Sequence, residues 1–220
     1  MKDSGRFGPL VSALVVLPLL GALGLVGHCG GVCRVAEIAA LCCYLAWLIL
    51  EVATASVREI SLPPAPEDRR TLERCALAQV ATAIGAVGLA HAWPLFWRWV
   101  DPAVSILGAA LVVLGGSLRL WAMATLGRWY SRRVRVQEGH QVVTRGPFRL
   151  VRHPAYLGNW VGHLGLGLAF QSPVSLLVCV LAFLPGIIAR IHREDEVLRH
   201  ELPGYACYAA RTARLLPGVW

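Results

Sequence analysis

The chain has 220 residues, of which 56% are hydrophobic and only 15% are charged, and its formal net charge is +8. About a quarter of the residues of a soluble domain are charged, so this composition excludes an ordinary soluble globular protein. Nucleic-acid binding would need a basic soluble face, which so apolar a sequence does not provide.

Six apolar runs reach or approach the roughly 20 residues that cross a bilayer as a helix. They are residues 8–28, 35–57, 75–97, 103–126, 154–171 and 174–191. Backbone groups in lipid must satisfy one another, which favours helices. We therefore expect one all-α domain, residues 1–220, forming a polytopic membrane bundle of about six (five to six) helices. The last two runs meet at Gln171, Ser172 and Pro173, which indicates a helical hairpin.

The N-terminal region contains two patterns with more than one interpretation. Lys2 and Arg6 before the run 8–28 resemble a secretory signal, but the run is long and lacks a clear cleavage site, which favours a retained helix. His28, Cys29 and Cys33 could suggest a metal site. Their spacing is looser than that of a zinc knuckle, and no second ligand pair follows, so we expect a glycine-rich turn and no metal.

The basic residues indicate the orientation of the bundle. Seven arginines lie within 127–152 and five more between Arg190 and the end, while Arg34 and Arg98 are the basic residues expected on the opposite side. With six helices, this bias places both termini in the cytoplasm. The same charges are suited to contact with lipid head groups. The membrane would be the plasma membrane of a bacterium or the endoplasmic reticulum of a eukaryote.

Unusual polar residues are concentrated in the second half of the chain. Residues 1–100 are expected to form N-terminal helices without chemical motifs, whereas residues 115–217 carry the candidate site. Arg119 lies inside an apolar helix, where a charge is costly. Its side chain must therefore pair with another group or reach the cytoplasmic interface, about two turns away.

The segment 127–158 alternates polar and apolar residues and then turns at Gly146-Pro147. A solvated basic connector would explain its arginines but not the run His153-Pro154-Ala155-Tyr156. Pro154 suits the first turn of a helix, whose free N–H groups would form an anion site at the membrane surface.

A third polar cluster follows where the last helix leaves the membrane. Arg190 and Glu194 are four residues apart and share a helix face, so they could simply form a surface ion pair. The expected hairpin, however, returns them to the start of the preceding helix, beside Tyr156. Cationic and carboxylate groups would then meet at one interfacial position that could hold a zwitterionic ligand.

Several motifs in the second half resemble the isoprenylcysteine carboxyl methyltransferase family of membrane enzymes and the related phospholipid N-methyltransferases. They are Leu126-Gly127, HQVV at 140–143, GPF at 146–148, RHPAYLG at 152–158, EDE at 194–196 and the closing YACYAARTARLLP. The spaced set covers 115–217. Phe148 stands where tyrosine is usual, and Pro203-Gly204 replaces a glycine step, which shortens that loop by one residue. Asp195 replaces the second glutamate of the common pair, so the acidic register could be read with Glu196 instead.

The resemblance implies S-adenosylmethionine as the methyl donor, bound at the cytoplasmic end of the C-terminal helices. The cofactor contacts it implies are His140, Gln141, Val142, Val143, Phe148, His153, Pro154, Ala155, Tyr156 and Glu194. It also implies a role in catalysis for Arg190 and Glu194. An acceptor carboxylate would need no general base at neutral pH, because its pKa is near 4.

The acceptor implied is lipidic or prenylated, methylated at a carboxylate or, alternatively, at a phospholipid amine. Two other functions stay open, an NADPH-dependent membrane reductase and a non-enzymatic membrane protein. The glycines 162, 165 and 167 resemble a dinucleotide motif, but no strand precedes them, and helix packing explains Gly158 and Gly162 better. The sequence does not define the oligomeric state.

Overall fold

The structure, a computed structural model, describes residues 32–59, 69–89, 101–218 and 220. The helix expected at 8–28, together with His28 and Cys29, lies outside the described residues, as does the end of the span expected at 75–97. Cys33 is described and lies buried in the first turn of a helix. The described part of the chain contains no group of three metal-ligating side chains.

The described residues form helices and no β-strand, which confirms the all-α prediction. Several helices continue directly into π-helical or 3-10 turns, so that α7, η6 and α8 make one long rod. The elements are α2 (Val32–Glu59), α3 (Arg69–Ile84), η3 (Gly85–Leu89), α5 (Pro102–Leu126), η4 (Gly127–Trp129), η5 (Gly146–Arg149), α6 (Pro154–Ala169), α7 (Pro173–Val178), η6 (Cys179–Phe183), α8 (Leu184–Glu201) and α9 (Tyr205–Ala209).

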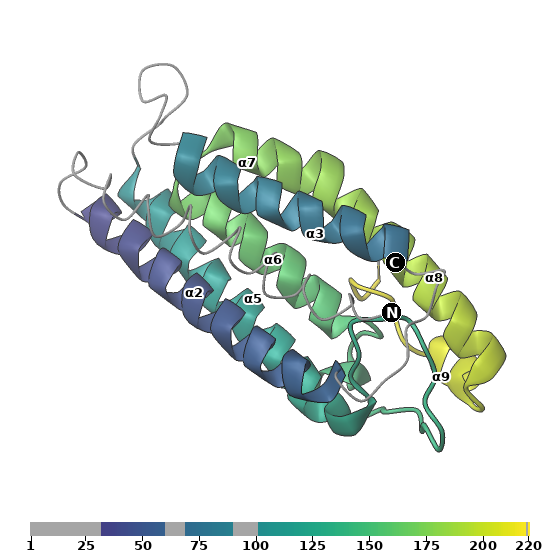
Figure 1. The fold of residues 1–220 in the computed structure, drawn as a ribbon. Helices are drawn as coiled ribbons and strands as arrows, with labels where there is room; N and C mark the ends of the chain where they lie inside the picture. Colours follow the sequence, from purple (N-terminus) through teal and green to yellow (C-terminus); the bar gives the residue numbers. More distant parts are fainter. Residues whose placement is uncertain (1–31, 60–68, 90–100, 219) are drawn as a thin grey trace, which may run out of the picture.

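Three described helical segments are long and apolar enough to cross a membrane: Val32–Ala53, Pro102–Trp129 and Pro173–Glu201. The last apolar run was expected over 174–191, and its helix continues through Arg190 and Glu194, as their shared face indicated, to Glu201. Helix α6 has 16 residues and is therefore only about 24 Å long, less than the ~30 Å hydrocarbon core. It lies in the middle of the bundle, between α2 and α5 on one side and α3 and α7 on the other (Figure 1).

The turn between α6 and α7 confirms the predicted hairpin. Gln171 has a positive φ of 48° there, and its side chain exchanges two hydrogen bonds of 2.9 Å with the Asp101 backbone at the start of α5. The Ser172 hydroxyl accepts a bond from the Ser175 N–H and so caps α7, with Pro173 in its first turn. The hairpin is thus fixed to α5 at the end of the bundle away from the polar segments.

Helices α5 and α6 pack through glycines, as predicted for Gly158 and Gly162. A Cβ atom added at Gly115 would lie 2.4 Å from the Gly162 nitrogen, and one at Gly158 would lie 2.5 Å from the Gly115 oxygen. Only glycine allows the two backbones to approach this closely. This close contact fixes the start of α6 relative to Arg119 on α5.

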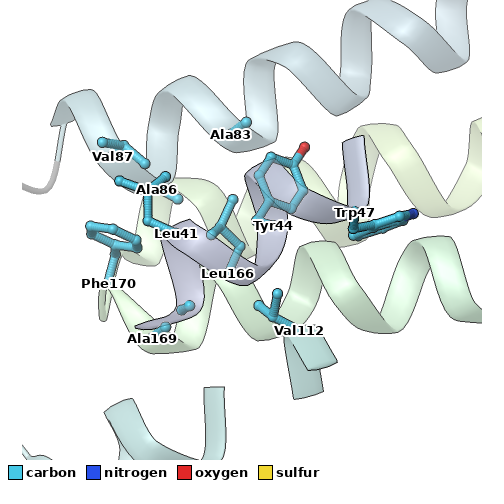
Figure 2. Packing of buried hydrophobic residues seen from close by; sticks show 11 residues of the cluster. Leu41, Tyr44, Trp47, Ala83, Ala86, Val87, Val112, Leu166, Ala169 and Phe170 are labelled. Atoms are coloured by element: carbon cyan, nitrogen blue, oxygen red, sulfur yellow. The ribbon is translucent and has the colours of Figure 1, made fainter. Parts of the chain in front are cut away.

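The main apolar core surrounds the middle of α2. Leu41, Tyr44 and Trp47 of α2 pack against Val112 of α5 and Leu166 of α6, with alanines and a valine from α3 and η3 covering them (Figure 2). The outer surface of the bundle exposes large apolar side chains, including Leu114 and Leu181, as expected for contact with lipid. Helix α2, whose sequence carries no family motif, is therefore an integral part of the bundle core.

Candidate functional site

Segments from four parts of the chain meet at one end of the bundle: the loop 127–153, the first turn of α6, the polar half of α8 and the C-terminal residues after α9 (Figure 1). The C-terminal residues pair with the loop through a parallel bridge between Val151 and Ala213. The Arg152 N–H donates to the Ala213 carbonyl at 2.8 Å, and the His153 N–H donates to the Arg214 carbonyl at 3.1 Å. These bonds position the start of α6 beside the end of the chain.

The Asp195 carboxylate of α8 is the centre of this junction. Its Oδ2 accepts from Arg152 Nη1 at 2.8 Å and from Arg214 Nε at 3.0 Å, while its Oδ1 bonds His153 Nε2 at 3.0 Å and accepts from the Tyr205 hydroxyl. Asp195 is 3% exposed. Four partners satisfy both oxygens of the buried carboxylate, which offsets the cost of removing it from water.

His153, which the family resemblance implies as a cofactor contact, is held by this carboxylate. The ring is 4% exposed, and its Nε2 is committed to Asp195. The family resemblance marks Asp195 only as a replacement for glutamate and does not indicate its central position. The acidic run 194–196 was the available signal, but the four partners of Asp195 come from distant parts of the chain.

Arg190 and Tyr156 meet as predicted, at the junction of α8 and α6. Arg190 Nε donates to the Tyr156 hydroxyl at 3.1 Å, and Arg190 Nη2 donates to the Arg132 carbonyl at 2.6 Å. The Glu194 side chain also interacts with Tyr156. The expected convergence of a cation, a carboxylate and a tyrosine at one position is therefore present in the structure.

His140 lies in the loop between η4 and η5, within electrostatic range of Glu194. Its ring stacks on Trp129, with 4.8 Å between the ring centroids and an interplanar angle of 15°. Its Nδ1 is buried and has no hydrogen-bond partner among the described residues. Burial lowers the pKa of the imidazole below its ordinary value of 6.5, while the charge of Glu194 opposes this shift. His140 is therefore neutral at pH 7, with one buried ring nitrogen unsatisfied.

The other residues implied as cofactor contacts have varied environments. Val142 packs on the apolar cluster of Leu202 and Tyr205 beside α9, whereas Gln141 is exposed and Val143 is half-buried. The Phe148 ring is 7% exposed, and its carbonyl accepts from the Tyr208 hydroxyl at 2.7 Å. Burial raises the pKa of Tyr208 to about 12, so this bond persists across the physiological range.

The first turn of α6 offers fewer free amides than the sequence predicted. Pro154 is buried and has no N–H, and the Tyr156 and Leu157 amides both donate to the His153 carbonyl at 3.1 Å. This helix end therefore has fewer free N–H groups to bind an anion than expected. Ala155 instead contributes its carbonyl, which accepts from Arg119 Nη1 at 3.1 Å.

The sequence left open whether Arg119 pairs with another group or reaches the membrane surface. In the structure it pairs with another group. Its side chain is buried and pairs with Glu51 of α2, with Arg119 Nε 2.7 Å from Glu51 Oε2. A charge at this depth is stabilised by a bidentate carboxylate partner. The pair links α2 to the site, and the sequence alone gave no indication of it.

These features define a polytopic α-helical membrane protein with a polar site at one end of its bundle. The isoprenylcysteine carboxyl methyltransferase (ICMT) family model matches residues 107–200, which contain nearly all of the site. The chain belongs to the ICMT family.

Three relatives are similar to this chain in sequence. The cobalt-zinc-cadmium resistance protein CzcN of Cupriavidus metallidurans is 38% identical over 54% of this chain and 51% of its own length. The nickel-cobalt-cadmium resistance protein NccN of Alcaligenes xylosoxydans xylosoxydans is 31% identical over 74% of this chain and 73% of its own length. A probable protein-S-isoprenylcysteine O-methyltransferase of Oryza sativa is 31% identical over 44% of this chain and 51% of its own length.

The fold has a counterpart among solved structures. The eukaryotic intramembrane Ras methyltransferase ICMT is similar with a TM-score of 0.62 at 18% identity, over 94% of this chain and 75% of that chain. This likeness supports the helical membrane fold. The match to CzcN and to the rice protein spans about half of each relative's length.

Proposed function

We propose that the protein is an integral-membrane, S-adenosylmethionine-dependent methyltransferase that methylates a carboxylate on a lipidic or prenylated acceptor. The observation that carries this proposal is the cluster of Arg190, Tyr156, Glu194 and His140 at one end of a membrane bundle. Methyltransferase relatives within the same family support it. The family membership favours this activity over a reductase or a non-enzymatic role.

The residues present fit the proposed cofactor. The buried Nδ1 of His140 lacks a partner in the described part of the chain, and a buried polar atom of this kind is usually satisfied by a ligand or water. Glu194 supplies a half-buried carboxylate nearby, able to accept from ribose hydroxyls or an ammonium group. The Trp129–His140 stack adds a flat aromatic surface on the same loop.

The chemistry asked of the protein is mainly positioning. When bound, S-adenosylmethionine supplies a methyl group that is already activated on a sulfonium centre. A carboxylate acceptor is ionised at neutral pH and needs no general base. Arg190 keeps a permanent positive charge beside Tyr156, which attracts the acceptor carboxylate and orients it. Burial of these groups keeps water out of the site.

The position of the site suggests how the two substrates arrive. The arginine-rich loop faces the side that the positive-inside rule assigns to the cytoplasm, where the cofactor is dissolved. An acceptor with a lipid tail can remain in the bilayer and approach between helices. We propose cytoplasmic termini and a bacterial plasma membrane or eukaryotic endoplasmic reticulum, with membrane lipids as neighbours of the basic loop.

Calorimetric titration of S-adenosylhomocysteine into the detergent-purified protein tests the cofactor, with NADPH titrated in parallel. We expect saturable binding of S-adenosylhomocysteine alone. Glu194→Gln should weaken it by about tenfold or more, as for loss of one charged hydrogen bond. Glu196 is exposed and bonds Arg193 at 2.9 Å, so Glu196→Gln is a matched control that should bind as the unaltered protein does. Binding of NADPH alone would support the reductase instead.

A further inference from the structure

Glu51 belongs to α2, outside the residues that the family model matches, and it contacts both sides of the candidate site. Its side chain is 11% exposed, and its two oxygens accept from Arg119 Nε and Nη2. Arg119 is the partner through which Glu51 reaches α6, because Arg119 Nη1 donates to the Ala155 carbonyl. Glu51 therefore acts on the His153–Tyr156 turn through one intervening side chain.

The second side of the site is the loop after α5. Glu51 Oε1 lies 3.9 Å from Arg132 Nη2, and the backbone carbonyl of Arg132 accepts the 2.6 Å bond from Arg190. Tyr130, two residues earlier, places its hydroxyl 3.5 Å from Arg119 Nη2. One carboxylate thus connects the loop that holds Arg190 and the turn that carries Tyr156.

We propose that Glu51 is a positioning residue for methyl transfer, which fixes Tyr156 and Arg190 relative to each other through Arg119 and the 130–132 segment. The inference rests on the proposed function for its catalytic consequence. The proposal gives α2, which lacks family motifs, a part in ordering the site through Arg119.

A purely structural role is the competing explanation, since a buried ion pair also joins helices. Its contribution to stability is often small compared with an apolar pair of the same shape, because both charges lose their hydration. The geometry distinguishes the two roles. The Arg119 guanidinium extends beyond Glu51 to the Ala155 carbonyl, a contact that helix packing does not need.

Helix α2 provides a matched control. Glu37 is also a buried carboxylate, 0% exposed, but lies 14 residues earlier and hence about 21 Å away along the helix. Glu37→Gln and Glu51→Gln both neutralise a buried carboxylate of α2. Only Glu51→Gln should loosen the site. Glu51→Asp keeps the negative charge and should therefore retain part of the order that Glu51→Gln loses.

The first measurement is hydrogen–deuterium exchange on the ligand-free protein in lipid nanodiscs. We expect Glu51→Gln to raise amide exchange at residues 130–135 and 155–159 by about tenfold, whereas Glu37→Gln leaves these segments unchanged. Unchanged exchange in Glu51→Gln, or an equal rise in both variants, would overturn the inference. Because no ligand is present, this result does not depend on whether the protein is a methyltransferase.

The second measurement uses S-adenosylhomocysteine affinity and, with an acceptor, the separation of kcat from KM. We expect Glu51→Gln to weaken affinity or lower kcat by about tenfold, with little change in the acceptor KM. Failure of the unaltered protein to bind S-adenosylhomocysteine would overturn the proposed function, while the exchange difference would still decide the role of Glu51.

Glu51→Gln leaves an unpaired buried arginine and can fail to fold, so a double variant completes the test. Glu51→Leu with Arg119→Met removes both charges and preserves packing, which keeps the bundle stable. It also removes the donor to the Ala155 carbonyl. We expect a folded protein with raised exchange at 155–159 and about tenfold weaker binding. Unaltered exchange and affinity in this variant would show that the Glu51–Arg119 pair is only structural, which would overturn the inference.

Discussion

Asp195 of α8 and His153 at the start of α6 are joined by a 3.0 Å contact between Oδ1 and Nε2, across 42 residues of sequence. Arg152, next to His153, bonds the other oxygen of the same carboxylate. The RHP motif and the acidic run of α8 are thus two halves of one buried ionic cluster. The motif spacing in the sequence reflects this cluster as well as any ligand contact.

Asp195→Asn should therefore destabilise the protein strongly. The substitution removes the charge that Arg152, His153 and Arg214 share, and leaves the buried Arg152 unpaired. Breaking a buried pair in this way costs about 3–5 kcal/mol. Thermal unfolding in detergent should show a large fall in the midpoint, whereas exposed Glu196→Gln should leave it unchanged. A midpoint equal to that of the unaltered protein would refute the central role of Asp195.

His153→Ala should lower stability as well as ligand affinity. The family resemblance implies His153 only as a cofactor contact, but its bond to Asp195 adds a structural cost of about 1.5–3 kcal/mol for a charged hydrogen bond. Parallel thermal melts and calorimetry separate the two effects. Loss of affinity with an unchanged melting midpoint would show that His153 contributes to ligand binding and not to stability.

Gly115→Ala should disrupt the contact between α5 and α6. The added methyl group would lie 2.4 Å from the Gly162 nitrogen, and both partners are rigid helix backbone. Overpacking of this kind costs about 1–3 kcal/mol or more. Gly88→Ala is the control, because its methyl group would meet only an Ile84 carbon at 3.7 Å. Equal melting midpoints for the two variants would contradict the close glycine packing.

The pH dependence of stability should include a term from His140. The pKa of its imidazole is lowered in the folded state, so the unfolded state binds the proton first as the pH falls. Stability is therefore fully present above the ordinary value of 6.5 and declines below it. Between about pH 7.5 and about pH 5.5, His140→Gln should lose less thermal stability than the unaltered protein. An identical decline in both would show that His140 is not responsible.

Arg190→Ala should impair turnover more than cofactor binding. Arg190 fixes the Tyr156 hydroxyl and the Arg132 carbonyl, and we propose that it orients the acceptor carboxylate. Loss of such an interaction lowers kcat by about 10²-fold or more. Single-turnover methylation and S-adenosylhomocysteine titration measure the two quantities separately. Unchanged methylation rates would remove the proposed role of Arg190.

The sequence predicted the helices well because apolar runs and their boundary residues are local signals. Helix α5 was expected at 103–126 and begins at Pro102, where the Asp101 side chain accepts from the Ala103 N–H. The start of α6 at Pro154 was predicted from the apolar run 154–171 and from the proline in its first turn. The last apolar run stops at residue 191, whereas the helix itself continues to Glu201, as the shared helix face of Arg190 and Glu194 indicated.

The site was predicted where motifs and topology agree, as for Arg190 beside Tyr156. Contacts between distant residues without a motif were not predictable. Glu51 and Arg119 are 68 residues apart, and neither hydropathy nor spacing pairs them. The buried role of Asp195 depends on Tyr205 and Arg214, which the chain brings back only after α8 has ended.

The most direct test of the central claim is transfer of a labelled methyl group from S-adenosylmethionine by the purified protein in nanodiscs, with a prenylcysteine that carries a free carboxylate. We predict labelled product that releases volatile methanol in alkali, as a methyl ester does, and its loss in Glu194→Gln but not in Glu196→Gln. An alkali-stable label on a lipid amine would contradict methylation of a carboxylate. Absence of transfer to either acceptor, in protein shown to be folded, would contradict the account as a whole.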